Sequence, residues 1–91
     1  MKFRYNYEKN AKLLLERNIS FDEIITYINN GNILARTEHQ NQNKYPNQKI
    51  LHVRIFDPVY SVPYVIEEDG TFFLKTFYPS RKAKKKYLDK Q

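Results

Sequence analysis

The chain has 91 residues, of which 41% are hydrophobic and 15% aromatic, and this length and composition predict one globular domain. Its formal net charge of +6 predicts an anionic partner. It contains no cysteine, and this excludes disulfides, thiolate nucleophiles and cysteine-ligated zinc. No apolar run approaches the ~20 residues of a membrane span, and the N-terminus lacks a signal-peptide pattern, so we expect a cytoplasmic protein without a membrane partner.

The first elements predicted are a short strand and a helix. Residues 2–5 alternate between charged and aromatic side chains, as in a half-buried strand. Asn6 is a candidate N-cap for a helix over residues 7–18. Leu13 lies off the apolar stripe of this helix, where it is either idle or a contact point for a partner. The stripe that we expect to face the core consists of Tyr7, Ala11, Leu14 and Leu15.

A second helix follows closely. The segment Ser20-Phe-Asp-Glu23 is a capping-box signature, and Gly31 is suited to the left-handed conformation beyond the end of the helix. The two helices are therefore predicted to form an αα-hairpin. The core-facing stripe of the second helix is Phe21, Ile24, Ile25 and Ile28.

From Asn32 onward the hydrophobic period changes to two, which predicts strands over residues 32–38, 50–56, about 60–66 and 71–78. Residues 39–47 form a polar loop, and Glu68-Asp-Gly70 marks a hairpin turn. Pro63 indicates an edge strand or a bulge. In the last strand we expect Phe73, Lys75 and Phe77 on one side and Phe72, Leu74 and Thr76 on the other.

This order of elements predicts an α+β domain over residues 1–91. The two N-terminal helices pack on one face of a four-stranded antiparallel sheet, and a basic helix ends the chain. The second face of the sheet would be free. His52, Arg54 and Lys75 are candidates to lie there, beside the basic helix.

The basic C-terminal helix is predicted from residues 80–88. Residues 75–91 hold seven of the sixteen Lys and Arg side chains but only one of the ten acidic ones, so the net charge of +6 lies wholly in this segment. Ser80 is a plausible N-cap. At ~100° per residue, one arc of the helix contains Ala83, Lys84, Tyr87 and Leu88, and the other contains Arg81, Lys82, Lys85 and Lys86. We name the second arc the cationic ridge. Its alternative role is a solvated face that keeps the protein soluble.

Most catalytic chemistries find no support in the sequence. His39 and His52 lack the spacing of metal ligands, the two glycines form no phosphate loop, and no serine has a nucleophile elbow, so we expect no metal and no cofactor. Cation-assisted cleavage of RNA remains possible, because the 2′-OH can attack its own phosphate once a base and cations are in place.

Three segments resemble the BrnT-type toxins of bacterial type II toxin–antitoxin systems, small proteins with a RelE/ParE-like fold. The segments are Phe3-Arg-Tyr-Asn-Tyr-Glu-Lys9, Glu16-Arg-Asn-Ile-Ser-Phe-Asp-Glu-Ile24 and Leu74-Lys-Thr-Phe-Tyr-Pro-Ser-Arg-Lys-Ala-Lys-Lys-Lys-Tyr87. The most specific part is Ser80-Arg-Lys-Ala83 after the last strand. Arg17-Asn18 at the helix junction and the extra lysines of the terminal helix indicate a divergent subgroup.

The resemblance implies a ribonuclease that inhibits translation and growth and is neutralised by a cognate DNA-binding antitoxin. The alternatives are a nucleic-acid-binding protein without catalysis and a ParE-like topoisomerase-blocking toxin. The candidate catalytic residues are His52, Arg54, Lys75, Tyr78 and Arg81. The candidate RNA-binding residues are Lys44, Tyr45, Lys49, Ser80, Lys82, Lys85 and Lys86. We expect an acidic antitoxin segment to lie across the cationic ridge, with Leu13 as a candidate apolar anchor.

Overall fold

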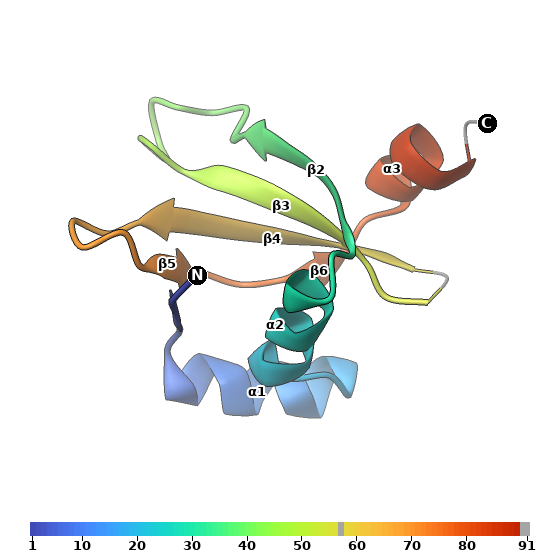
Figure 1. Cartoon of the computed structure of the whole chain (residues 1–91), viewed down its shortest axis with the longest axis horizontal. Helices are drawn as coiled ribbons and strands as arrows, with labels where there is room; N and C mark the ends of the chain where they lie inside the picture. The colour runs from blue at the N-terminus through green and yellow to red at the C-terminus, as the bar shows by residue number, and fades with distance from the viewer. Residues whose placement is uncertain (57, 90–91) are drawn as a thin grey trace.

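A six-stranded sheet separates two N-terminal helices from the C-terminal helical segment in the computed structural model, which describes residues 1–56 and 58–89 (Figure 1). The α+β class is therefore confirmed. The elements in chain order are β1 (Phe3–Arg4), α1 (Tyr7–Arg17), α2 (Phe21–Asn29), β2 (Ile33–Glu38), β3 (Lys49–Arg54), β4 (Val59–Ile66), β5 (Phe72–Leu74), β6 (Tyr78–Pro79), α3 (Arg81–Lys84) and the π-helical turn η1 (Lys85–Asp89).

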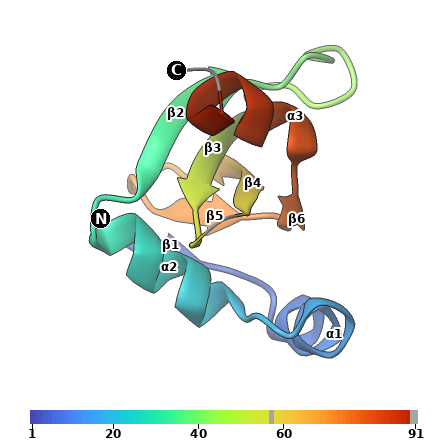
Figure 2. The ribbon, with the colours of Figure 1, turned by 90° about the vertical axis from the view of Figure 1, so that its right-hand side faces the viewer.

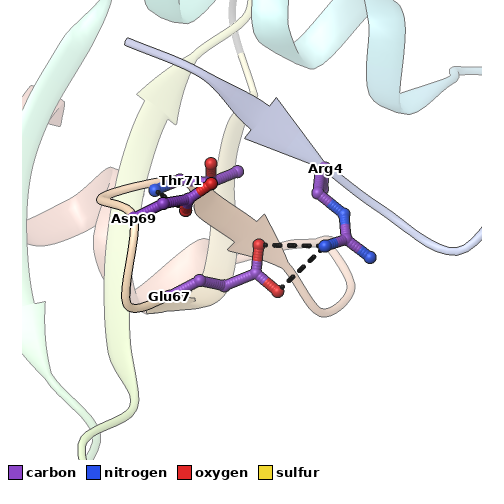
Figure 3. Close-up of polar contacts among 4 residues, drawn as sticks. All are labelled: Arg4, Glu67, Asp69 and Thr71. Atoms are coloured by element: carbon purple, nitrogen blue, oxygen red, sulfur yellow. Dashed lines mark hydrogen bonds and ion pairs between the residues drawn. The ribbon is translucent and has the colours of Figure 1, made fainter.

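The sheet is mixed, so the prediction of a four-stranded antiparallel sheet is wrong in strand number and direction. Its order is β1-β5-β4-β3-β2, with β6 also paired to β4, and β1 runs parallel to β5. Two contacts hold β1 in place. The Phe3 ring packs against Phe72 at 5.8 Å between centroids, and Arg4 reaches Glu67 in the β4–β5 turn at 3.4 Å (Figure 3). The backbone N–H of Phe72 also donates to the Lys2 carbonyl at 2.8 Å, so β1 has both backbone and side-chain contacts with its partner strand.

The predicted strand over residues 71–78 is interrupted opposite Pro63. Tyr64 pairs with Leu74, but Ser61 pairs with Tyr78, so residues 75–77 oppose only Val62 and Pro63. This extra residue is a bulge, one of the two alternatives that the proline indicated, whereas β4 is an interior strand and not an edge. The expected alternation is therefore wrong after Leu74. Phe77 is fully buried together with Leu74 instead of facing the other way.

The second helix forms as its local signals predict. Ser20 and Glu23 make the capping box, and Phe21, Ile24 and Ile28 are buried. Ile25 only packs at the margin of the core, so it is not the buried anchor that the stripe suggested. The helix packs against β3, where Leu51 and Val53 are fully buried, and the core lies between α2 and this face of the sheet.

The first helix has the opposite orientation to the one predicted. Leu13 is the one buried residue of α1, at 3% exposed, while Tyr7 and Leu15 are 81% and 89% exposed. The inward side also carries Asn10, whose side-chain oxygen accepts a hydrogen bond from the Phe21 backbone at 2.7 Å. The start of α2 thus fixes which side of α1 faces inward. The two helices cross steeply and do not lie alongside each other as an αα-hairpin would (Figures 1 and 2).

The second face of the sheet is not free. The C-terminal segment α3–η1 lies across it, on the side opposite α1 and α2 (Figure 2). Val59 is 1% exposed and His52 is 9% exposed on this face. The sheet therefore has a helical element on each side.

Candidate nucleic-acid interface

The C-terminal helix is fixed at its beginning by the strand that it follows. The backbone N–H of Ser80 donates to the Val59 carbonyl at 2.8 Å, continuing the β4–β6 pairing. The Ser80 hydroxyl oxygen accepts from the Ala83 N–H at 3.0 Å, which confirms the predicted N-cap. Ala83 itself is 4% exposed against the sheet. Strand pairing, cap and packing together set the direction of the helix.

The two predicted arcs of this helix are present. Ala83 is buried and Lys84, Tyr87 and Leu88 are half-buried, whereas the four residues of the cationic ridge are exposed. The Lys86 ammonium lies 5.4 Å from the centroid of the Tyr87 ring, a cation–π distance. Charges of one sign on one side of a short helix create a local positive potential that favours an anionic ligand.

His52 lies under this helix, held by one hydroxyl on each side. Its Nδ1 is 2.9 Å from the Ser61 hydroxyl of β4, and its Nε2 is 2.9 Å from the Thr37 hydroxyl of β2. The Tyr87 ring packs on the imidazole at 5.2 Å between centroids. The pairing His52↔Ser61 across β3 and β4 brings the first of these contacts about directly. The imidazole is thus fixed in position and orientation.

The environment of His52 favours its neutral form. Burial lowers the pKa of the imidazole, and the positive charge of Lys86 lowers it further. A neutral imidazole has one nitrogen that donates and one that accepts, so one of the two hydroxyls accepts a hydrogen bond and the other donates one. A fixed neutral imidazole can accept a proton at its unprotonated nitrogen, through the hydroxyl that donates to that nitrogen.

A cavity of about 450 Å³ opens between the C-terminal helix and the sheet. Both aromatic and cationic groups line it, which suits a phosphate with an attached base. Its lining residues are Thr37, Glu38, His39, Gln40, Ile50, His52, Ser61, Tyr78, Ser80, Lys82, Ala83, Lys86 and Tyr87.

The cavity brings together five of the predicted site residues, and the other seven lie elsewhere. The five are His52, Tyr78, Ser80, Lys82 and Lys86. Arg81 and Lys85 belong to the ridge but line the outer side of the helix. Arg54 donates from Nε to the Phe56 carbonyl at 3.1 Å, at the far end of β3. The remaining four are Lys44, Tyr45, Lys49 and Lys75, none of which lines this cavity.

Two of these outlying groups form small clusters of their own. The Tyr45 ring packs on His39 at 4.4 Å, and the Lys44 ammonium lies 5.4 Å from the Tyr45 ring. Lys75 lies 5.7 Å from the ring of Phe73. His39 also lines the cavity, so the loop cluster lies at its margin, whereas the cluster of Lys75 does not reach it.

Sequence reasoning did not identify Thr37, Ser61 or Tyr87 as site residues. Ser61 has no nucleophile elbow, and Tyr87 lies on the arc of the C-terminal helix opposite the cationic ridge, so neither residue carries a signal for a site. Their common property is contact with His52. Alternation along the strands places Thr37 and Ser61 on the same face as His52, but only the register shows that Ser61 lies opposite His52 and that Thr37, which pairs with Ile50, is its diagonal neighbour.

Within residues 1–56 and 58–89, no three His, Cys, Asp or Glu side chains gather so as to hold a metal ion. In the same part of the chain, no helix has the length and apolar character needed to cross a membrane. Comparison of the chain with protein-family models, with curated proteins and with solved structures finds no match in any of the three.

Proposed function

We propose that this protein is a metal-independent endoribonuclease, acting as the toxin of a BrnT-like type II toxin–antitoxin system. The observation that supports the proposal is the cavity in which a fixed neutral imidazole, a phenol and two ammonium groups meet, from His52, Tyr78, Lys82 and Lys86. These are the groups that RNA cleavage by the neighbouring 2′-OH requires: a proton acceptor, a proton donor and cations for the phosphate.

In the proposed reaction, the 2′-oxygen forms a bond to the adjacent phosphorus and the bond from phosphorus to the 5′-oxygen breaks. The hydroxyl of Thr37 or Ser61 passes the 2′-OH proton to His52, and Tyr78 protonates the leaving 5′-oxygen. Lys82 and Lys86 stabilise the charge that develops on the phosphate. The products are a 2′,3′-cyclic phosphate and a 5′-hydroxyl. His52 then returns its proton to Tyr78 through solvent.

Binding without cleavage is the second candidate function. It is favoured by the fact that both imidazole nitrogens of His52 already contact protein hydroxyls and that the residue is only 9% exposed. In that case the same cavity and cationic ridge hold a nucleic-acid strand. His52 with its partners Thr37, Ser61 and Tyr87, which we name the His52 cluster, then serves only to support the sheet.

Incubation of the purified protein with RNA in the presence of EDTA separates the two functions. The proposal expects fragments with cyclic phosphate ends, and a loss of cleavage in the Lys82→Ala/Lys86→Ala variant. The matched control is Lys2→Ala/Arg17→Ala, which removes the same charge from exposed positions outside the cavity. Intact RNA together with salt-sensitive retention would instead support binding alone. Cells that arrest on induction while their RNA stays intact would contradict the nuclease proposal.

The cognate antitoxin is proposed to cover the cationic ridge with an acidic segment. Exposed ion pairs contribute little on their own, so apolar contacts must supply much of the affinity. Leu13 is not available for this, because it is only 3% exposed. Charge reversal in Lys82→Glu/Lys85→Glu should abolish capture of the product of the adjacent gene. Undiminished capture would mean that the antitoxin docks elsewhere.

A further inference from the structure

The outward side of α1 carries an apolar stripe that no other part of the described chain covers. Tyr7, Leu14 and Leu15 are 81%, 44% and 89% exposed, and Ala11 between them is exposed as well. They follow the spacing i, i+4, i+7, i+8, which places them on one side of the helix. Continuous apolar stripes of this kind mark interaction sites, in contrast to single exposed apolar residues.

The stripe lies far from the proposed RNA site. α1 is on one side of the sheet and the basic helix is on the other (Figures 1 and 2). Residues 1–74 carry equal numbers of basic and acidic side chains, so the net charge of +6 lies in residues 75–91, which include the basic helix. A contact through α1 therefore keeps the two cationic helices of a pair of molecules apart.

Charged residues beside the stripe are arranged for self-pairing. Glu8 and Lys12 lie next to each other along the same edge of the stripe, at ~100° and ~140° when Tyr7 is at 0°. Within the described residues, neither of them forms an ion pair. Two antiparallel α1 helices related by a two-fold axis level with Asn10, midway between Glu8 and Lys12, place Glu8 of each copy at the height of Lys12 of the other.

We propose that the stripe binds a second copy of this chain, as an antiparallel α1–α1 pair with two Glu8–Lys12 contacts between copies. The stripe offers on the order of 300–400 Å² of apolar surface per copy, below the ~800 Å² of a standard interface. The dimer is therefore weak and reversible. The edge of the stripe carries one negative and one positive charge, Glu8 and Lys12, so it offers an acidic partner no net electrostatic attraction.

Sedimentation velocity over a range of protein concentrations tests the pair. The wild type should approach twice the mass of one chain as the concentration rises. Glu8→Lys alone and Lys12→Glu alone each place two like-charged pairs in the interface, and should raise the dissociation constant roughly tenfold. An equimolar mixture of the two single variants should dimerise again, because both pairs are then of opposite sign. The double variant Glu8→Lys/Lys12→Glu should dimerise on its own.

Two further variants separate this surface from non-specific association. Leu15→Ser should weaken the dimer, whereas Ile66→Ser, at a side chain that is 49% exposed on β4, should leave it unchanged. Circular dichroism melts show that each variant is folded. A wild type that stays monomeric at all concentrations would overturn the proposal. So would a dimer that is indifferent to Glu8→Lys, or a mixture of the two single variants that stays monomeric. None of these outcomes depends on ribonuclease activity.

Discussion

Ser61→Ala is the substitution that examines the His52 cluster most directly. Ser61 is 1% exposed, and its hydroxyl lies 2.9 Å from Nδ1 of His52. The variant removes one partner and leaves a nitrogen that water hardly reaches. Leaving a buried polar group unsatisfied costs about 1–3 kcal/mol of unfolding free energy. For a domain of this size each kcal/mol lowers the melting temperature by about 4–8 °C, so we expect a decrease of about 4–24 °C.

Urea unfolding at pH 7.5 measures this effect, and a double-mutant cycle assigns it to the contact. His52→Leu also destabilises the protein, because it leaves the hydroxyls of Ser61 and Thr37 without their hydrogen-bond partner. The double variant Ser61→Ala/His52→Leu removes both sides of the Ser61 contact, and should cost less than the sum of the two single variants by about 0.5–3 kcal/mol. Additivity within about 0.3 kcal/mol would refute the contact as a stabilising interaction.

Two other outcomes follow from the same structure. The pKa of His52 in the folded protein is below its ordinary value of 6.5, so below pH 6.5 the unfolded chain binds more protons than the folded one. The free energy of unfolding should therefore fall as the pH drops from 6.5 through the folded pKa. Urea midpoints measured over this range should show a weaker pH dependence in His52→Leu than in the wild type. Ile24→Ala removes three buried carbons, each worth ~0.8 kcal/mol before any cavity term, and should cost about 2–5 kcal/mol. Ile25→Ala, at a partly buried side chain, should cost clearly less by thermal melting, and an equal loss would contradict the orientation of α2.

Local signals in the sequence were sufficient for the elements whose orientation depends on their own residues. The capping box of α2, the Ser80 cap and the two arcs of the C-terminal helix were all predicted correctly. In each case the deciding interactions lie within one or two turns of the same helix. Five of the twelve proposed site residues line one cavity, because four of them lie within the nine residues 78–86, in β6 and the basic helix with its cap, and His52 lies under this helix.

Features that depend on partners distant in the sequence could not be read in this way. The stripe of α1 is more apolar than its inward side, yet Leu13 is the residue that is buried, because Asn10 binds the backbone at the start of α2. The parallel pairing of β1 rests on Phe72 and Glu67, more than sixty residues away. The pattern shows which side chains share a face, but it does not show which faces meet.

The bulge opposite Pro63 shows how the local sequence pattern and the pairing of distant strands together position the site residue Tyr78. Without the bulge opposite Pro63, Tyr78 would share a face with Phe72 and Leu74, on the side of the core. The slip from Tyr64↔Leu74 to Ser61↔Tyr78 instead sends Phe77 into the core and puts Tyr78 on the face of His52. The chain then leaves β6 on that side of the sheet, and the Ser80 cap starts the basic helix above the imidazole. Because Pro63 has no N–H to pair, the ladder loses nothing at the point where the partner strand bulges. The proline that weakened the strand prediction is therefore compatible with the bulge that places Tyr78 in the lining of the cavity.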